Sequence, residues 1–219
     1  MEQKADRQRR EFLKKAATTA AGTTILSTTA TGTALAGGRT TIEINDHTKH
    51  GNPVYYIIKV QDPYMRKESK ANGGDNVSNN HSDGTSKATG HVNGGRDTFS
   101  FSTRIREIIL EAENGQGGVT ITCYGGWGYD GASGVNIWND GKHIGGSDHE
   151  YKFTNKYGAI WSPGDGSLES NDYKDDGYAV GHVDGGHDHW DSNGRLKQLY
   201  VNMFNGYRFH YKRFDGKRW

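Results

Sequence analysis

The chain contains very little cysteine and proline and no long apolar run, and each shortage excludes a class of protein. Cys123 is the one cysteine in 219 residues, which excludes an intrachain disulfide and a cysteine-rich metal site. Proline occurs 3 times, whereas glycine occurs 32 times without a three-residue period; this excludes collagen and favours many short turns. No run of about 18 apolar residues is present, so we expect no transmembrane helix. The net charge of +1 gives no reason to expect a nucleic-acid partner.

Catalytic motifs are also missing from the sequence. It has no G-x-S-x-G, no H-E-x-x-H, no phosphate-binding loop and no C-x-x-C. A glycosidase needs two carboxylates on either side of the scissile bond, but the sequence alone singles out no such pair. We therefore expect a non-catalytic protein, with no catalytic residue and no cofactor to assign.

The first 36 residues have the order of features of an export signal. A basic stretch precedes an uncharged stretch rich in Ala, Thr and Gly, which ends in an A-x-A site formed by Ala34 and Ala36. Five residues match the twin-arginine consensus: Arg9, Arg10, Phe12, Leu13 and Lys14. We predict cleavage after Ala36 and a secreted or cell-surface protein that meets a membrane only during export. The alternative is a charged amphipathic helix of the mature protein.

A duplication organises the rest of the chain. The block Gly90–Asp97 recurs as Gly181–Asp188, and the block Ile42–Asp46 recurs within 135–140. Because the blocks keep their order, the sequence predicts a signal peptide (1–36), a first repeat (37–129) and a second repeat (130–219). We expect each repeat to fold as its own domain; one pseudo-symmetric sandwich built from both halves is the alternative.

Within each repeat, the apolar residues alternate with polar ones. Val119–Cys123 and Tyr207–Tyr211 show this period of two, which is typical of half-buried antiparallel strands. The segment 105–112 also fits a helix, but its β-branched residues favour a strand. The fold class predicted is all-β, with two tandem antiparallel β-sandwich-like repeats, and Cys123 is expected to be a small buried side chain.

Two polar segments are predicted to connect strands. Asn114-Gly115 and Asn205-Gly206 are typical of tight β-hairpin turns. The segment Asn72–Ser86 contains almost no apolar residue, so we expect a flexible loop. It carries two N-glycosylation sequons, at Asn76 and Asn80.

These blocks resemble a known kind of protein. Tyr56–Val60 with Gly90–Ser102, and Tyr151–Phe153 with Gly181–Trp190, are similar to the repeats of an uncharacterised family of exported haloarchaeal tandem β-repeat proteins. The resemblance covers nearly the whole mature chain and implies a β-repeat fold. Related domains look like appendages of secreted carbohydrate-active proteins.

The repeated G-H-V-x-G-G-x-D block allows a structural and a functional interpretation. In the structural one, its paired glycines form a turn with positive φ, its aspartates (Asp97 and Asp188) cap that turn, and its valine lies in the core. In the functional one, His91 or His182 forms a polar pocket with an aspartate.

The second repeat also contains a cluster of possible metal ligands. Imidazole and carboxylate groups together suit a divalent metal such as zinc, copper or nickel. The candidate ligands are His182, Asp184, His187 and His189. The alternative is a chance cluster of solvated side chains.

Aromatic residues give the leading functional hypothesis. Their faces can stack on sugar rings, while nearby amides and carboxylates bind hydroxyls; the alternative is that they fill the core. The ligand-binding candidates are Trp127, Trp138, Trp161 and Asp140. We expect a glycan or another cell-surface component as the partner. A self-associating structural or adhesive surface protein is the runner-up, and a secreted metal-dependent enzyme is the third hypothesis.

Overall fold

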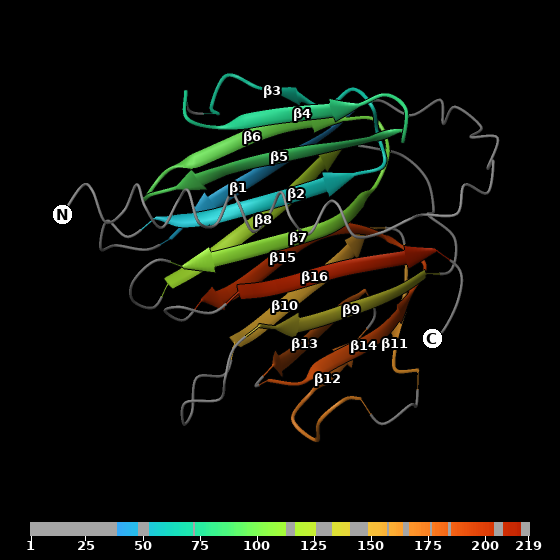
Figure 1. Ribbon diagram of the computed structural model, residues 1–219. Coiled ribbons are helices and arrows are strands. Elements are labelled where there is room, and N and C mark those ends of the chain that lie inside the picture. The colour runs from blue at the N-terminus through green and yellow to red at the C-terminus, as the bar shows by residue number, and fades with distance from the viewer. Residues whose placement is uncertain are drawn as a thin grey trace. The chain divides into compact units, whose positions relative to one another are not determined.

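The structure is a computed structural model, and it describes residues 39–47, 53–71, 73–112, 117–125, 133–140, 149–156, 158–163, 167–175, 177–183, 185–203 and 208–215. The predicted signal peptide (1–36) and all its consensus residues lie outside these ranges. Within them, the chain forms strands and turns and no helix, so no described helix could cross a membrane (Figure 1).

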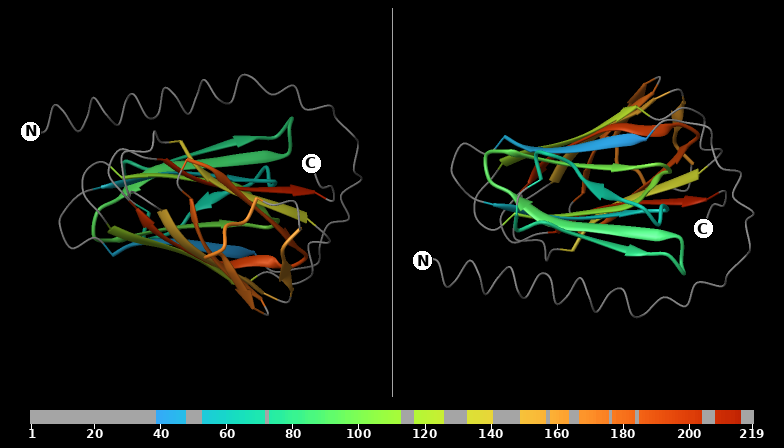
Figure 2. Two further views of the ribbon diagram at one scale, coloured as in Figure 1. Left: turned by 90° about the horizontal axis from the view of Figure 1, so that it is seen from below. Right: turned by 90° about the horizontal axis from the view of Figure 1, so that it is seen from above.

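The strands form two antiparallel sheets that stack as two layers (Figure 2). Sheet A has the order β12 (Tyr173–Asp175), β13 (Tyr178–Val183), β10 (His149–Lys156), β15 (Arg195–Met203), β8 (Gly117–Gly125), β1 (Thr40–Asp46), β6 (Arg96–Phe101), β3 (Arg66–Lys67). Sheet B has the order β11 (Ile160–Trp161), β14 (His187–Ser192), β9 (Ser133–Asn139), β16 (Arg208–Asp215), β7 (Ile105–Ala112), β2 (Val54–Val60), β5 (Thr85–Val92), β4 (Asn76–Asn80). The predicted all-β, sandwich-like fold is confirmed.

The two repeats occupy equivalent places in this sandwich, with the sheets exchanged. The strands β1, β3, β6 and β8 of the first repeat lie in sheet A, and their counterparts β9, β11, β14 and β16 lie in sheet B. Conversely, the other four strands of the first repeat lie in sheet B, and their counterparts in the second repeat lie in sheet A. This is the topology of a twofold-symmetric dimer whose subunits have been joined into one chain.

Both sheets continue across the boundary between the repeats. In sheet A, β15 pairs with β8, and in sheet B, β16 pairs with β7. At the second of these junctions the Arg208 Nε lies 2.6 Å from Glu111 Oε2. Each repeat therefore supplies four strands to each sheet, and its inner edges are closed by the other repeat.

The hairpins predicted at the two Asn-Gly pairs are wrong. The strands that flank Asn114-Gly115 are β7 and β8, which lie in opposite sheets. The same holds for β15 and β16, which flank Asn205-Gly206. Each of these four strands pairs with a strand of the other repeat instead. The chain therefore passes from one sheet to the other between β7 and β8, and again between β15 and β16. The Asn-Gly residues themselves lie outside the described residues.

The loop predicted for Asn72–Ser86 is also wrong. Its middle forms β4, which pairs with β5 at the edge of sheet B. The segment is polar because this edge strand is exposed, not because it lacks regular structure. The sequon residues Asn76 and Asn80 are both exposed on β4, and their glycosylation stays a prediction.

The core lies between the sheets and contains the alternating apolar residues. Ile42 and Ile121, for example, are fully buried on neighbouring strands. Cys123 belongs to this core, and burial raises the pKa of its thiol to about 12. Its assignment as a small buried side chain is confirmed. The strand favoured for 105–112 is confirmed as well.

The boundary between the repeats yields the first testable expectation. In a fragment of residues 37–129, the edges of β7 and β8 lack their partner strands β16 and β15. In a second copy of the fragment, the equivalent strands β8 and β7 can take those places. We expect this fragment to be a dimer in sedimentation equilibrium. A monomer that unfolds cooperatively in urea would instead show that one repeat is an independent domain.

Candidate functional site

A hydrogen bond between a tyrosine and an aspartate joins the two sheets inside each repeat. Tyr56 on β2 donates to Asp97 Oδ2 on β6 at 3.0 Å. Tyr151 on β10 donates to Asp188 Oδ2 on β14 at 2.7 Å. All four residues are buried, and each pair spans opposite sheets. We call these two pairs the tyrosine clasps.

The turn at the paired glycines of the repeated motif is capped by residues outside the motif. Gly94 N donates to Asp46 Oδ2, and Gly185 N donates to Asn139 Oδ1, both at 2.9 Å. The positive φ predicted for the paired glycines is confirmed at Gly94 (64°) and Gly185 (73°). The capping predicted for the motif aspartates is wrong, because their carboxylates accept the tyrosine hydroxyls in the core.

The first glycine of each motif block is required by the clasp. A Cβ on Gly181 would lie 2.3 Å from Tyr151 Oη and 2.9 Å from Asp172 Oδ1. Gly90 has the same place beside Tyr56 in the first repeat. The most specific motif of the sequence therefore builds the connection between the sheets.

Burial governs the protonation of the second clasp. It raises the pKa of Asp188 to about 7, against the lowering effect of the hydrogen bond from Tyr151, and nearby Asp172 and Glu169 add to the rise. Burial and the Asp188 carboxylate also raise the pKa of Tyr151 well above its usual value. Trp190 Nε1 donates to the same tyrosine oxygen at 2.8 Å, and its side chain is buried in the core.

The three candidate metal ligands that the structure describes are not gathered at one point. His182 lies on β13 in sheet A, and its Nδ1 is 3.3 Å from the side-chain nitrogen of Asn171. His187 and His189 lie together on β14 in sheet B. Asp184 is outside the described residues. Among the residues that the structure describes, no three His, Cys, Asp or Glu side chains are placed to hold a metal ion.

An open groove lies on the outer face of sheet B in the second repeat. Its volume is about 610 Å³. The groove forms there because Val135 and Ile137 turn inward to the core, which leaves the alternate side chains of β9 facing outward. The side chains that line it come from β9, β14 and β16: Asn136, Trp138, His187, His189, Lys212 and Phe214.

The orientation of Trp138 in this groove is set by its neighbours. Its ring stacks on His210 with centroids 4.6 Å apart and planes 7° apart. His210 Nε2 lies 2.8 Å from Asp140 Oδ2, and we assign the ring proton to Nε2 as the donor. Burial lowers the pKa of His210, although Asp140 opposes this. The structure thus brings two predicted ligand-binding residues, Trp138 and Asp140, onto one neutral imidazole.

Asn136 contributes an unusual acceptor to the groove. It pairs with His189 on one neighbouring strand and with Lys212 on the other. Its Oδ1 is buried and has no hydrogen-bond partner in the described part of the chain. A buried acceptor without a bond is destabilising, so this atom is suited to accept a hydroxyl from a ligand or a water.

Sequence reasoning missed three residues of this region: Asn136, Lys212 and Phe214. The alternation within β16 placed its polar residues on the outer face, but it could not show that β16 pairs with β9. Of the remaining candidates, Trp161 is half-buried on β11, where it pairs with Asp191 and does not line the groove. Trp127 lies outside the described residues.

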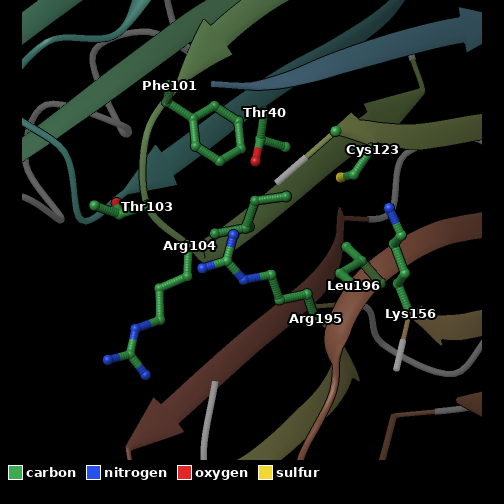
Figure 3. A pocket seen from close by; sticks show the side chains of 10 residues that line it. Thr40, Phe101, Thr103, Arg104, Cys123, Lys156, Arg195 and Leu196 are labelled. Atoms are coloured by element: carbon green, nitrogen blue, oxygen red, sulfur yellow. The ribbon is translucent and has the colours of Figure 1, made fainter. Parts of the chain in front are cut away.

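A second cavity, at the boundary of the repeats, is much smaller (Figure 3). Its volume is about 20 Å³, which is room for about one water. Arg104, Lys156 and Arg195 bring positive charge to it, above apolar residues that include Cys123 and Leu196. Because of its size, we take the groove on sheet B as the candidate site.

The glycine beside the clasp yields a stability prediction. Gly181→Ala should lower the free energy of unfolding by about 1–3 kcal/mol, because the fully buried Tyr151 ring must shift to admit the new methyl group. Gly186→Ala is the matched control: a Cβ there meets no atom within 4 Å, so the change should stay within about 0.5 kcal/mol. Urea unfolding measures both, and equal losses would contradict the role of the clasp.

The buried carboxyl group of the second clasp yields a pH prediction. Its folded-state pKa of about 7 exceeds the usual 3.8, so the folded state binds this proton more tightly. The contribution of Asp188 to stability is therefore full below pH 4 and falls as the pH rises to about 7, by no more than about 4 kcal/mol. Asp188→Asn should remove this decline from urea unfolding curves measured between pH 4 and 8. An unchanged pH profile in the variant would refute the assignment.

Comparison with known proteins supplies no relative, so any function must be inferred from the geometry of the site. No family model, no curated protein and no solved structure matches the chain. The resemblance to haloarchaeal repeats stays a prediction.

Proposed function

We propose that the protein binds a saccharide in the groove of the second repeat and that Trp138 is the central contact. The observation that carries this proposal is an indole held at a fixed angle on the wall of an open groove. An aromatic face packs against the C–H face of a sugar ring and excludes water from it. The stack on His210 limits the movement of the indole, so less conformational entropy is lost on binding.

The polar groups around Trp138 suit the hydroxyls of a sugar. Asn136 Oδ1 lacks a hydrogen bond within the described chain, and a ligand hydroxyl would supply one. His187 is exposed beside Trp138 on the neighbouring strand and can donate or accept. An aromatic wall with a few polar groups is the usual composition of a site that orients a small polar ligand.

The size and lining of the groove favour binding over hydrolysis. A volume of about 610 Å³ fits a ligand of a few sugar rings, and the open shape admits a segment of a longer chain. No carboxylate is among the described residues that line it, whereas a glycosidase needs two. This supports a binding protein rather than an enzyme.

The edges of the sheets give less support to self-association. Of the four outermost strands, β3 and β11 have 2 residues each and β12 has 3, whereas β4 has 5. Short edge strands offer few backbone groups for pairing with another chain. A saccharide ligand on the outside of the cell agrees with the export signal predicted for 1–36.

Affinity electrophoresis tests the proposal. Residues 37–219 are run in gels that contain a panel of polysaccharides, with free oligosaccharide as competitor. We expect competable retardation by at least one polymer, and Trp138→Ala should weaken it at least about tenfold, as expected for a central aromatic contact.

Tyr173→Ala serves as the matched control, because Tyr173 is an exposed aromatic on sheet A, away from the groove. Its retardation should equal that of the unmodified protein. Retardation by no polymer, or equal loss in both variants, would reject saccharide binding at this groove. Circular dichroism establishes that each variant is folded.

A further inference from the structure

We infer that the groove selects an acidic saccharide, one that carries a carboxylate or a sulfate group. This rests on the saccharide-binding function proposed above and adds the chemical class of the ligand. The inference stands on the arrangement of charge around Lys212, on the way neighbouring carboxylates are bonded, and on a contrast between the two repeats.

Lys212 brings to the groove a cation that is paired with none of the described carboxylates. Its Nζ lies 5.0 Å from the centroid of the Phe214 ring, and it forms no ion pair with the described residues. Glu107 pairs with it across β7 and β16. That carboxylate is instead bonded to Lys59 Nζ.

The other nearby carboxylate is also bonded elsewhere. Asp140 Oδ2 accepts from His210 Nε2 at 2.8 Å, on the side of Trp138 that faces β16. Among the described residues that line the groove, Lys212 carries a positive charge and none has a carboxylate. A site of this charge favours an anion and disfavours a cation.

The cation and the free acceptor are adjacent. Asn136 and Lys212 are directly opposite on β9 and β16, and such neighbours have Cβ atoms about 4.5–5.5 Å apart. A single sugar ring can therefore place its acidic group at Lys212 and a hydroxyl at Asn136 Oδ1. The Trp138 indole, two positions along β9, is on the same face of the sheet.

The equivalent surface of the first repeat is charged differently. Glu43 pairs with Thr98 and Thr122 as Asn136 pairs with His189 and Lys212, so a carboxylate and a threonine stand where the second repeat has an amide and a lysine. Glu43 is in turn engaged by Lys70 Nζ at 3.3 Å and by Arg96 Nη1 at 3.7 Å. In the first repeat the carboxylate at this place is paired with two cations, whereas in the second repeat Lys212 has no carboxylate partner among the described residues.

Matched pairs of polymers that differ only in the acidic group test the inference. Gels contain polygalacturonate or its methyl ester, and dextran sulfate or dextran; the two pairs distinguish carboxylate from sulfate. We expect the acidic member of at least one pair to bind about tenfold more tightly, the effect of one hydrogen bond to a charged group. Added salt should weaken this binding.

Lys212→Gln should abolish the preference and leave binding of the neutral member unchanged. Lys152→Gln is the matched control, because the Lys152 ammonium also lies over an aromatic ring, 4.6 Å from the Tyr178 centroid, but on sheet A. It should retain the full preference.

Each result separates the two proposals. Equal binding of both members of every pair, abolished by Trp138→Ala, would overturn the acidic preference and leave saccharide binding intact. A preference that survives Lys212→Gln would place the anion elsewhere and also overturn the inference. Binding of no polymer in any gel would overturn the proposed function itself.

Discussion

The buried hydrogen bond between a tyrosine of one sheet and an aspartate of the other is the constraint on which the rest of this sandwich depends. Tyr56–Asp97 and Tyr151–Asp188 place polar groups in the core, where an unmade bond is costly, so each tyrosine and aspartate must face one another across the layers. This sets the register of one sheet over the other. It also requires glycine at positions 90 and 181, where any side chain would collide with the clasp.

The second constraint is the exchange of sheets between the repeats. Each repeat ends in two strands, β7 and β8 in the first and β15 and β16 in the second, that lie in opposite sheets. Each of these strands has one edge that its own repeat leaves open and that the other repeat closes. The result has the internal symmetry of a dimer but needs no association step. The outward-facing residues of the two repeats are free to differ, because neither the core nor the backbone hydrogen bonds between strands depend on them.

That freedom produces the candidate site. The groove lies on the second repeat, where Trp138 stands on the outer face and Lys212 is brought beside Asn136 by the pairing of β9 with β16. The first repeat has Glu43 on the equivalent surface, where its carboxylate is paired with two cations. The proposed function therefore depends on residues that the duplication did not keep equal.

The sequence by itself determined the all-β class, the duplication, the buried Cys123 and the strand at 105–112, because period-two alternation and repeated blocks depend only on local order. It also offered Trp138 and Asp140 as ligand-binding candidates, which stay predictions. Only the tertiary structure decided that the Asn-Gly connections cross between sheets, that 76–80 is an edge strand and that the motif aspartates form clasps. These depend on which distant strands pair, and strand pairing is set by packing between residues far apart in the chain. Lys212 and Asn136 meet for the same reason.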